Sequence, residues 1–144
     1  MADMAETIAC LRIFGDDLDP DEMTKLLGCS PTASARKGDV RAKKFKERTG
    51  RWQLQADVRV PGDLNGQLKE IFAKLVCDID VWKRVTTHYE CDVFCGLFMS
   101  EVNEGIELDP SILLMLGSRG IQLGLDIYGP IAKLSDHSEE VFGA

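Results

Sequence analysis

The sequence predicts an α+β protein with a mixed, largely antiparallel sheet of about five to six strands and helices packed on one face. Residues 51–60, RWQLQADVRV, alternate strictly between apolar and polar side chains, which is typical of a strand with one buried face. Two Asp-Pro helix starts, at 19–20 and 109–110, each precede apolar residues at helical spacing. Helices mixed with hairpin-compatible strands favour a sheet with the helices on one side.

The size and composition of the chain indicate one domain. Its 144 residues, 44% apolar and 28% charged, are ordinary for a globular domain. We expect a single domain over 1–144, with a regular core at about 7–128 and a loosely docked tail at 131–144. The net charge of −7 weighs against general affinity for nucleic acid.

The sequence favours a cytoplasmic location. No apolar stretch approaches the ~20 residues that cross a bilayer, and residues 1–15 lack the basic and apolar segments of a secretory signal. The five cysteines are odd in number and form no CxxC motif. We therefore expect reduced, mostly buried thiols.

The acidic stretch GDDLDPDEM, residues 15–23, follows a predicted strand at 7–14 and begins a helix. Asp19 suits the N-cap, because its carboxylate can accept hydrogen bonds from the free N–H groups of the first turn. Pro20 fits the first helical position, and Gly28 fits the residue after the helix end.

The same acids do not fit a calcium loop. Asp17, Asp19 and Asp21 alternate as the first ligands of such a loop do, but the loop needs glycine at its sixth position and glutamate at its twelfth. Counted from Asp17, those positions hold Glu22 and Gly28. We therefore interpret the acids as helix-start residues.

Residues 29–50 are expected to hold a short strand near 33–37 and a long hairpin loop. Within 36–51, eight basic residues stand against two acids. Phe45 and Trp52 flank these charges, and aromatic rings among lysines and arginines can stack on bases. The segment is a candidate for binding a polyanion, although the acidity of the whole chain argues against nucleic acid.

The strand at 51–60 is expected to bury one face. Its buried side chains would be Trp52, Leu54, Ala56, Val58 and Val60. Pro61 ends the strand. Asp63 then caps a helix that runs to about Cys77, and a further short helix is expected within 78–90.

The C-terminal half is expected to complete the sheet. CDVFCGLFM, 91–99, is apolar on nearly both faces and predicts a central strand, which a short strand at 103–108 would follow. Asp109 would cap the second Asp-Pro helix, with Leu113, Leu114 and Leu116 buried. The last strand is predicted at 121–128, with Ile121, Leu123, Leu125 and Ile127 pointing inward.

Several motifs, taken in order, resemble one known family. They are LRIFGDDLDPDEMTKLLGCSPT with RKGD, then GRWQL, then DVW with YECDVFCGLFM, then GIELDPSILLMLGSRGIQLGLDIY. Together they cover roughly residues 7–128 and resemble the bacterial family catalogued as domain of unknown function 4279. The resemblance implies a bacterial, stand-alone, single-domain protein. It implies no established activity and no catalytic residues.

His88, Cys91 and Cys95 are the nearest approach to a metal or nucleophile site. In a strand, Cys91 and Cys95 would stand about 13 Å apart at ~3.3 Å per residue, which is too far for one zinc ion. A Cys91–His88 pair would need thiolate and imidazole in contact, and a core thiol beside a surface imidazole is the simpler interpretation. The sequence contains no GxSxG, P-loop or HExxH motif. We expect no cofactor, no metal and no catalytic residue.

The sheet face away from the helices is the remaining candidate site. Polar and aromatic side chains on it can be solvated, bind a small ligand or contact a partner. Phe94 and Phe98 share the Asp92 side of their strand and would form an apolar patch. The candidate binding residues are Arg12, Arg51, Gln53, Arg59, Asp92, Phe94, Phe98, Asp126 and Tyr128.

We expect a non-enzymatic binding or protein-interaction domain that uses this face, with a protein partner or self-association and no membrane contact. One version is an antidote-type protein that neutralises a basic partner, since a charge of −7 would steer association. The alternatives are a small-ligand sensor or small enzyme with a cleft near Arg12, Asp92 and Asp126, and polyanion binding by the basic loop 36–51.

Overall fold

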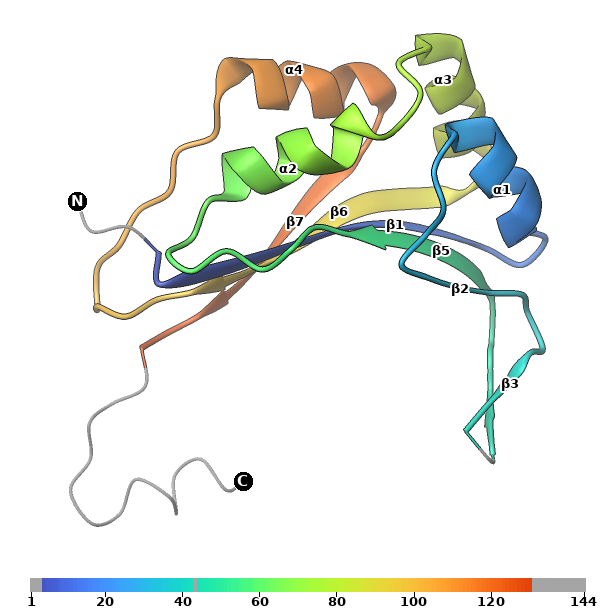
Figure 1. Cartoon of the computed structure of the whole chain (residues 1–144), viewed down its shortest axis with the longest axis horizontal. Coiled ribbons are helices and arrows are strands. Elements are labelled where there is room, and N and C mark those ends of the chain that lie inside the picture. Colours follow the sequence, from blue (N-terminus) through green and yellow to red (C-terminus); the bar gives the residue numbers. More distant parts are fainter. Residues whose placement is uncertain (1–3, 43, 131–144) are drawn as a thin grey trace.

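The computed structural model of the chain describes residues 4–42 and 44–130, and the predicted loose docking of the tail 131–144 lies outside them. The described part contains four helices, a five-stranded sheet and a separate two-stranded hairpin (Figure 1). In chain order, the elements are β1 (Glu6–Gly15), α1 (Pro20–Leu27), β2 (Ala33–Ala35), β3 (Val40–Arg41), β4 (Phe45–Lys46), β5 (Gly50–Gln55), α2 (Leu64–Ala73), α3 (Ile79–His88), β6 (Glu90–Phe98), α4 (Pro110–Arg119) and β7 (Gln122–Tyr128).

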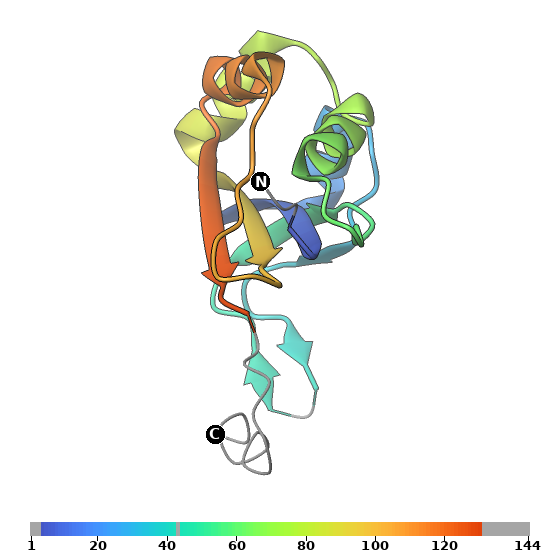
Figure 2. The same ribbon diagram turned by 90° about the vertical axis from the view of Figure 1, so that its left-hand side faces the viewer.

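The main sheet has the strand order β2–β5–β1–β6–β7. Neighbouring strands are antiparallel except β6 and β7, which are parallel. All four described helices lie on one side of this sheet, and no described helix covers the other side (Figure 2). The predicted fold class, an α+β protein with a mixed, largely antiparallel sheet and helices on one face, is confirmed.

Alternation along the strands separates the two sides of the sheet. On β1, Ala9, Leu11 and Ile13 are fully buried beneath the helices, while the residues between them face the other way. Trp52 of β5 and Trp82 of α3 are the largest fully buried side chains of this core. One layer of helices therefore covers the core, and the opposite sheet face has no covering helix among the described residues.

The two Asp-Pro helices differ in how their caps are used. The Asp19 carboxylate accepts from two first-turn N–H groups of α1, at 3.0 and 3.4 Å, and Gly28 ends the helix at φ +83°, as predicted. Asp109 also occupies the N-cap, of α4, but it makes no side-chain cap bond. Its carboxylate instead accepts from Lys69 Nζ of α2 at 3.1 Å, so the predicted capping by Asp109 is wrong.

The buried face of α4 is narrower than predicted. Ile112 and Leu116, four residues apart, form the buried line and face the core. Leu113 and Leu114 are exposed, so the prediction that they are buried is wrong. A helix at the margin of the sheet buries a single stripe, and neighbouring residues lie about 100° apart around it.

β5 ends before the predicted limit of the strand at 51–60. Side chains of α2 form hydrogen bonds with the backbone of Asp57. Glu70 accepts from its N–H at 3.2 Å, and Gln67 donates to its C=O at 3.0 Å. The prediction of buried side chains is consequently wrong for Val58 and Val60, which are exposed. The short strand expected at 103–108 is not formed either, since those residues belong to the loop before α4.

Candidate binding face

The uncovered side of the sheet brings together all but one of the predicted binding residues. Arg12 of β1 lies directly opposite Gln53 of β5 and, on its other side, opposite Asp92 of β6. Cross-strand partners point to the same face of a sheet. The register places eight predicted residues on this side, which we call the open face: Arg12, Arg51, Gln53, Asp92, Phe94, Phe98, Asp126 and Tyr128.

Arg12 and Asp92 form the centre of the open face. Two parallel hydrogen bonds join them, from Arg12 Nε to Asp92 Oδ1 at 2.9 Å and from Arg12 Nη2 to Asp92 Oδ2 at 2.7 Å. The guanidinium also lies 4.5 Å from the ring centroid of Phe94 and 5.4 Å from that of Phe14. The hydrogen bonds to Asp92 raise the pKa of Arg12 above its ordinary value. The pair is a fixed feature of the surface because each charge is held by the other.

An aromatic pair lies farther along the face, where β6 and β7 end. The rings of Phe98 and Tyr128 stack at 4.7 Å between centroids and 6° between planes. Tyr128 Oη donates to Asp126 Oδ2 at 2.6 Å, and this bond raises the pKa of the phenol. The pair presents a flat apolar surface with a hydroxyl and a carboxylate at its edge.

Arg51 and Gln53 occupy the β5 side of the open face. Arg51 Nη1 donates to Gln53 Oε1 at 3.2 Å, and Arg51 Nη2 lies 3.4 Å from Glu47 Oε1. Glu47 is nearly buried, and its Oε1 also forms an ion pair with Arg41 Nε at 3.5 Å. The basic hairpin loop is thereby tied to the sheet through one carboxylate.

A hollow of about 520 Å³ adjoins the Arg12–Asp92 pair. It is lined by Arg12, Phe14, Thr86, Tyr89, Glu90, Cys91, Asp92 and Gln122. Asp126, which the sequence prediction placed beside such a cleft, is not among these residues. Burial raises the pKa of the Cys91 thiol to about 12, which opposes formation of a nucleophilic thiolate there. Phe14 and Glu90 could have been predicted, because they share the strand parity of Arg12 and Asp92.

Arg59 is the predicted binding residue that lies elsewhere. It bridges Thr7, which is fully buried on the helix side of β1, and its guanidinium pairs with Glu70 of α2. The prediction of Arg59 on the polar strand face is wrong because the strand has already ended and the chain has turned toward α2.

The comparisons with known proteins identify the family of the chain. Residues 5–130 match the family described as Domain of unknown function (DUF4279). The chain belongs to this family. No curated protein and no solved structure gives a significant match. The match spans every helix and strand described above, so the open face is part of the DUF4279 domain.

The basic segment of this DUF4279 domain is partly neutralised by the acidic stretch. Arg36 pairs with Asp19 and Asp21 at 2.7 and 3.1 Å, and Lys37 pairs with Asp16 at 3.0 Å. In the part of the chain that the structure describes, no ion pair involves Lys44, Lys46 or Arg48. The acidic residues of 15–23 therefore cap α1 and form ion pairs with the start of the basic segment.

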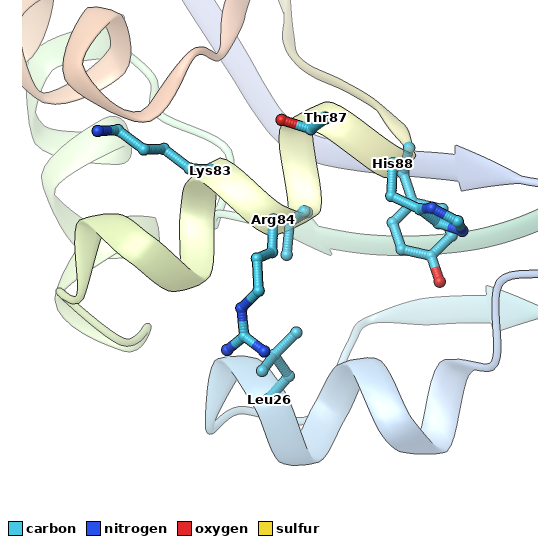
Figure 3. A pocket seen from close by; sticks show the side chains of 7 residues that line it. Leu26, Lys83, Arg84, Thr87 and His88 are labelled. Atoms are coloured by element: carbon cyan, nitrogen blue, oxygen red, sulfur yellow. The ribbon is translucent and has the colours of Figure 1, made fainter.

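A second hollow, of about 580 Å³, lies between α1 and α3 on the helix side of the domain (Figure 3). Arg84 of α3 points across it toward Leu26 of α1, whereas Lys83 points away. At its end, His88 Nε2 lies 2.7 Å from Asp17 Oδ2. The sequence predicted a short helix within 78–90, and no spacing rule would have placed Leu26 opposite it.

The described residues show neither a metal cluster nor a membrane span. Among residues 4–42 and 44–130, no three His, Cys, Asp or Glu side chains are grouped so that they could hold a metal ion. None of the helices in those ranges is long and apolar enough to cross a bilayer.

Proposed function

We propose that this DUF4279 chain is a non-catalytic binding protein whose open face docks onto a protein partner. The Arg12–Asp92 pair between Phe14 and Phe94 carries the proposal. Aromatic residues and arginine are enriched at protein interfaces, and arginine is also enriched among the few residues that dominate the binding energy. Side chains that are already fixed lose little conformational entropy on binding.

The groups beside the hollow support recognition over proton transfer. Both carboxylate oxygens of Asp92 accept from Arg12, and this two-bond pairing fixes the orientation of the carboxylate. Burial raises the pKa of the nearby Cys10 thiol to about 11. We therefore infer that Asp92 and Cys10 contribute to the shape and charge of a binding surface.

The partner we favour is a basic protein, as for an antidote-type domain. The chain carries a net charge of −7, which speeds encounter with a positive partner. Asp126 and Glu90 provide carboxylates on or beside the open face. We also propose a bacterial, cytoplasmic protein. The five cysteines, all among the described residues, form no disulfide, which supports a reducing compartment; the bacterial origin rests on the family resemblance.

Paired capture tests the role of the open face. Wild type would be used as bait beside Phe94→Lys, which puts a charge on the open face, and Leu114→Lys, which puts one on the exposed side of α4. We expect one protein, identified by mass spectrometry, to be retained by wild type and Leu114→Lys and lost with Phe94→Lys. Equal retention by both variants would contradict the proposal.

The second candidate function is binding of a small ligand in the hollow beside Arg12 and Asp92. Its volume of about 520 Å³ is within the range of small-molecule sites. A thermal-melt screen against nucleotides, sugars and amino acids distinguishes the two functions. A ligand at about 100 times its Kd adds about 2.7 kcal/mol to stability, which in a domain of this size raises Tm by roughly 5 °C or more. Such a shift, lost in Asp92→Ala, would favour the ligand site over the protein partner.

Polyanion binding by the hairpin loop is the third candidate. Lys44, Lys46 and Arg48 are the basic residues that favour it, since the described part of the chain shows no ion pair for them. Binding of this kind weakens steeply with salt. Retained binding to an oligonucleotide after Lys44→Gln and Lys46→Gln would exclude it.

A further inference from the structure

The two edges of the sheet are built differently. β2, at one edge, has three residues, whereas β7, at the other, has seven. An edge strand offers unpaired backbone groups to a further strand, and proteins usually block such pairing with short strands, prolines or inward-pointing charges. Within β7 the single charged residue is Asp126, which lies on the open face, and there is no proline. β7 itself therefore carries none of these features, and no other strand among residues 4–42 and 44–130 pairs with its outer edge.

The hydrogen bonds of β7 show which of its backbone groups face outward. Met99 N–H donates to the Tyr128 C=O at 3.0 Å, so the backbone of Tyr128 points toward β6. Backbone groups alternate in direction along a strand. The N–H and C=O groups of Leu123, Leu125 and Ile127 consequently point away from the sheet.

The side chains of the same residues are incompletely covered. Leu123, Leu125 and Ile127 share the helix side of β7, yet Leu125 is 42% exposed and Ile127 is 56% exposed. α4 packs over this margin of the sheet, but Ile112 and Leu116 are the only side chains of α4 that are buried there. An apolar strip thus runs along a strand whose outer backbone pairs with no other strand in the described part of the chain.

We propose that β7 pairs with β7 of a second copy of this chain. In the antiparallel arrangement with a twofold axis at Leu125, every residue of β7 finds a partner. Leu125 would face Leu125 of the second copy, and Leu123 would face Ile127. On the open face, Gln122 would face Tyr128, and Gly124 would face Asp126.

This register is self-complementary, as a twofold interface requires. Leu123, Leu125 and Ile127 have outward backbone groups, so they form the hydrogen-bonded pairs of an antiparallel ladder. All side chains on the helix side are apolar, and no charge faces a like charge. Parallel pairing would instead set the apolar strip of one copy beside the polar face of the other.

The dimer would join two sheets into one and leave both open faces on the same side. The interface therefore uses a surface different from the one proposed for partner binding. A dimer would present that partner with two adjacent copies of the site, which increases avidity when the partner can reach both.

Sedimentation equilibrium of the full chain over micromolar to millimolar concentrations tests the pairing. We expect a reversible monomer–dimer equilibrium based on the 16.0 kDa chain. Leu125→Lys should raise the dimer Kd at least tenfold, because two like charges would meet at the twofold axis. Val58→Lys, at a residue of matching exposure (47%) outside the sheet, should leave the Kd unchanged.

Two further readouts locate the interface. An equimolar mixture of Leu125→Lys and Leu125→Glu should restore dimers, since opposite charges then meet. Amide exchange of Leu123, Leu125 and Ile127 should slow as the concentration of wild type rises. A monomer at all concentrations, a dimer that Leu125→Lys leaves intact, or protection of these amides in the monomer, which would mean that another part of the chain covers the edge, would each overturn the proposal.

Discussion

Arg12 and Asp92 are direct partners across β1 and β6, and two hydrogen bonds of 2.9 and 2.7 Å join their side chains. They are separated by eighty positions in the chain, and the antiparallel register alone brings them together. Asp92→Ala should lower the free energy of unfolding by about 1–3 kcal/mol, because it leaves a partly buried guanidinium unpaired. Urea denaturation measures the loss.

The exposed pair of Lys25 and Glu22 provides the control for that prediction. Lys25→Ala should cost less than about 1 kcal/mol, since solvent screens this pair. A double-mutant cycle of Arg12→Ala and Asp92→Ala should give a clear coupling energy. If the two variants are simply additive, the pair does not fix the open face.

The packing of α4 leads to a second prediction. Ile112→Ala should destabilise the fold by about 2–5 kcal/mol because it opens a cavity in the core. Leu114→Ala should change stability by less than about 0.5 kcal/mol, since that side chain is 71% exposed. Thermal unfolding of both variants measures the difference, and similar losses would mean that α4 is rotated from the orientation described here.

Thiol reactivity provides a third prediction. Cys77 is exposed, whereas burial raises the pKa of Cys95 and Cys91 to about 12 and of Cys10 to about 11. Because the thiolate is the reactive form, iodoacetamide at about pH 8 should modify Cys77 first and these three last. Peptide mass spectrometry over a time course measures the order. Early modification of Cys91 would contradict the assignment of an inert core thiol.

Acid should weaken the fold through Glu70. The hydrogen bond from Arg59 holds the pKa of Glu70 below its ordinary 4.5. A carboxyl group with a lowered pKa in the folded state stabilises the fold above its unfolded pKa, and this stabilisation is lost as the pH falls through the folded pKa. Stability should therefore drop below about pH 4.5, and Glu70→Gln should make that dependence shallower. Urea midpoints across this range measure it, and an unchanged slope would contradict the role of the pair.

Much of the fold could be predicted because its local signals agree. Asp19 with Pro20, the alternation around Trp52 and the apolar strand at 91–99 each indicate one element, and the structure forms all three. Strand parity also predicted the open face, since Arg12, Asp92 and their neighbours lie at alternate positions. Each of these features follows from spacing within a single helix or strand, whereas the pairing of Arg12 with Asp92 depends on the register between two strands.

The sequence predictions are wrong where side chains from distant parts of the chain determine the local structure. β5 ends where Glu70 and Gln67 of α2 form hydrogen bonds with the backbone of Asp57. Asp109 occupies the N-cap of α4, but its carboxylate pairs with Lys69 and makes no cap bond. Neither contact is visible in the sequence, and the hollow beside Arg12 depends on α3 in the same way.

Site-specific photo-cross-linking tests whether the open face docks onto a protein partner. Phe94, on the open face, and Leu114, on the far side of α4, would each be replaced by p-benzoylphenylalanine in cells that express the chain. We expect an adduct with a different protein from position 94 and none from position 114. An adduct from position 114 alone, or none from either position, would contradict docking through the open face.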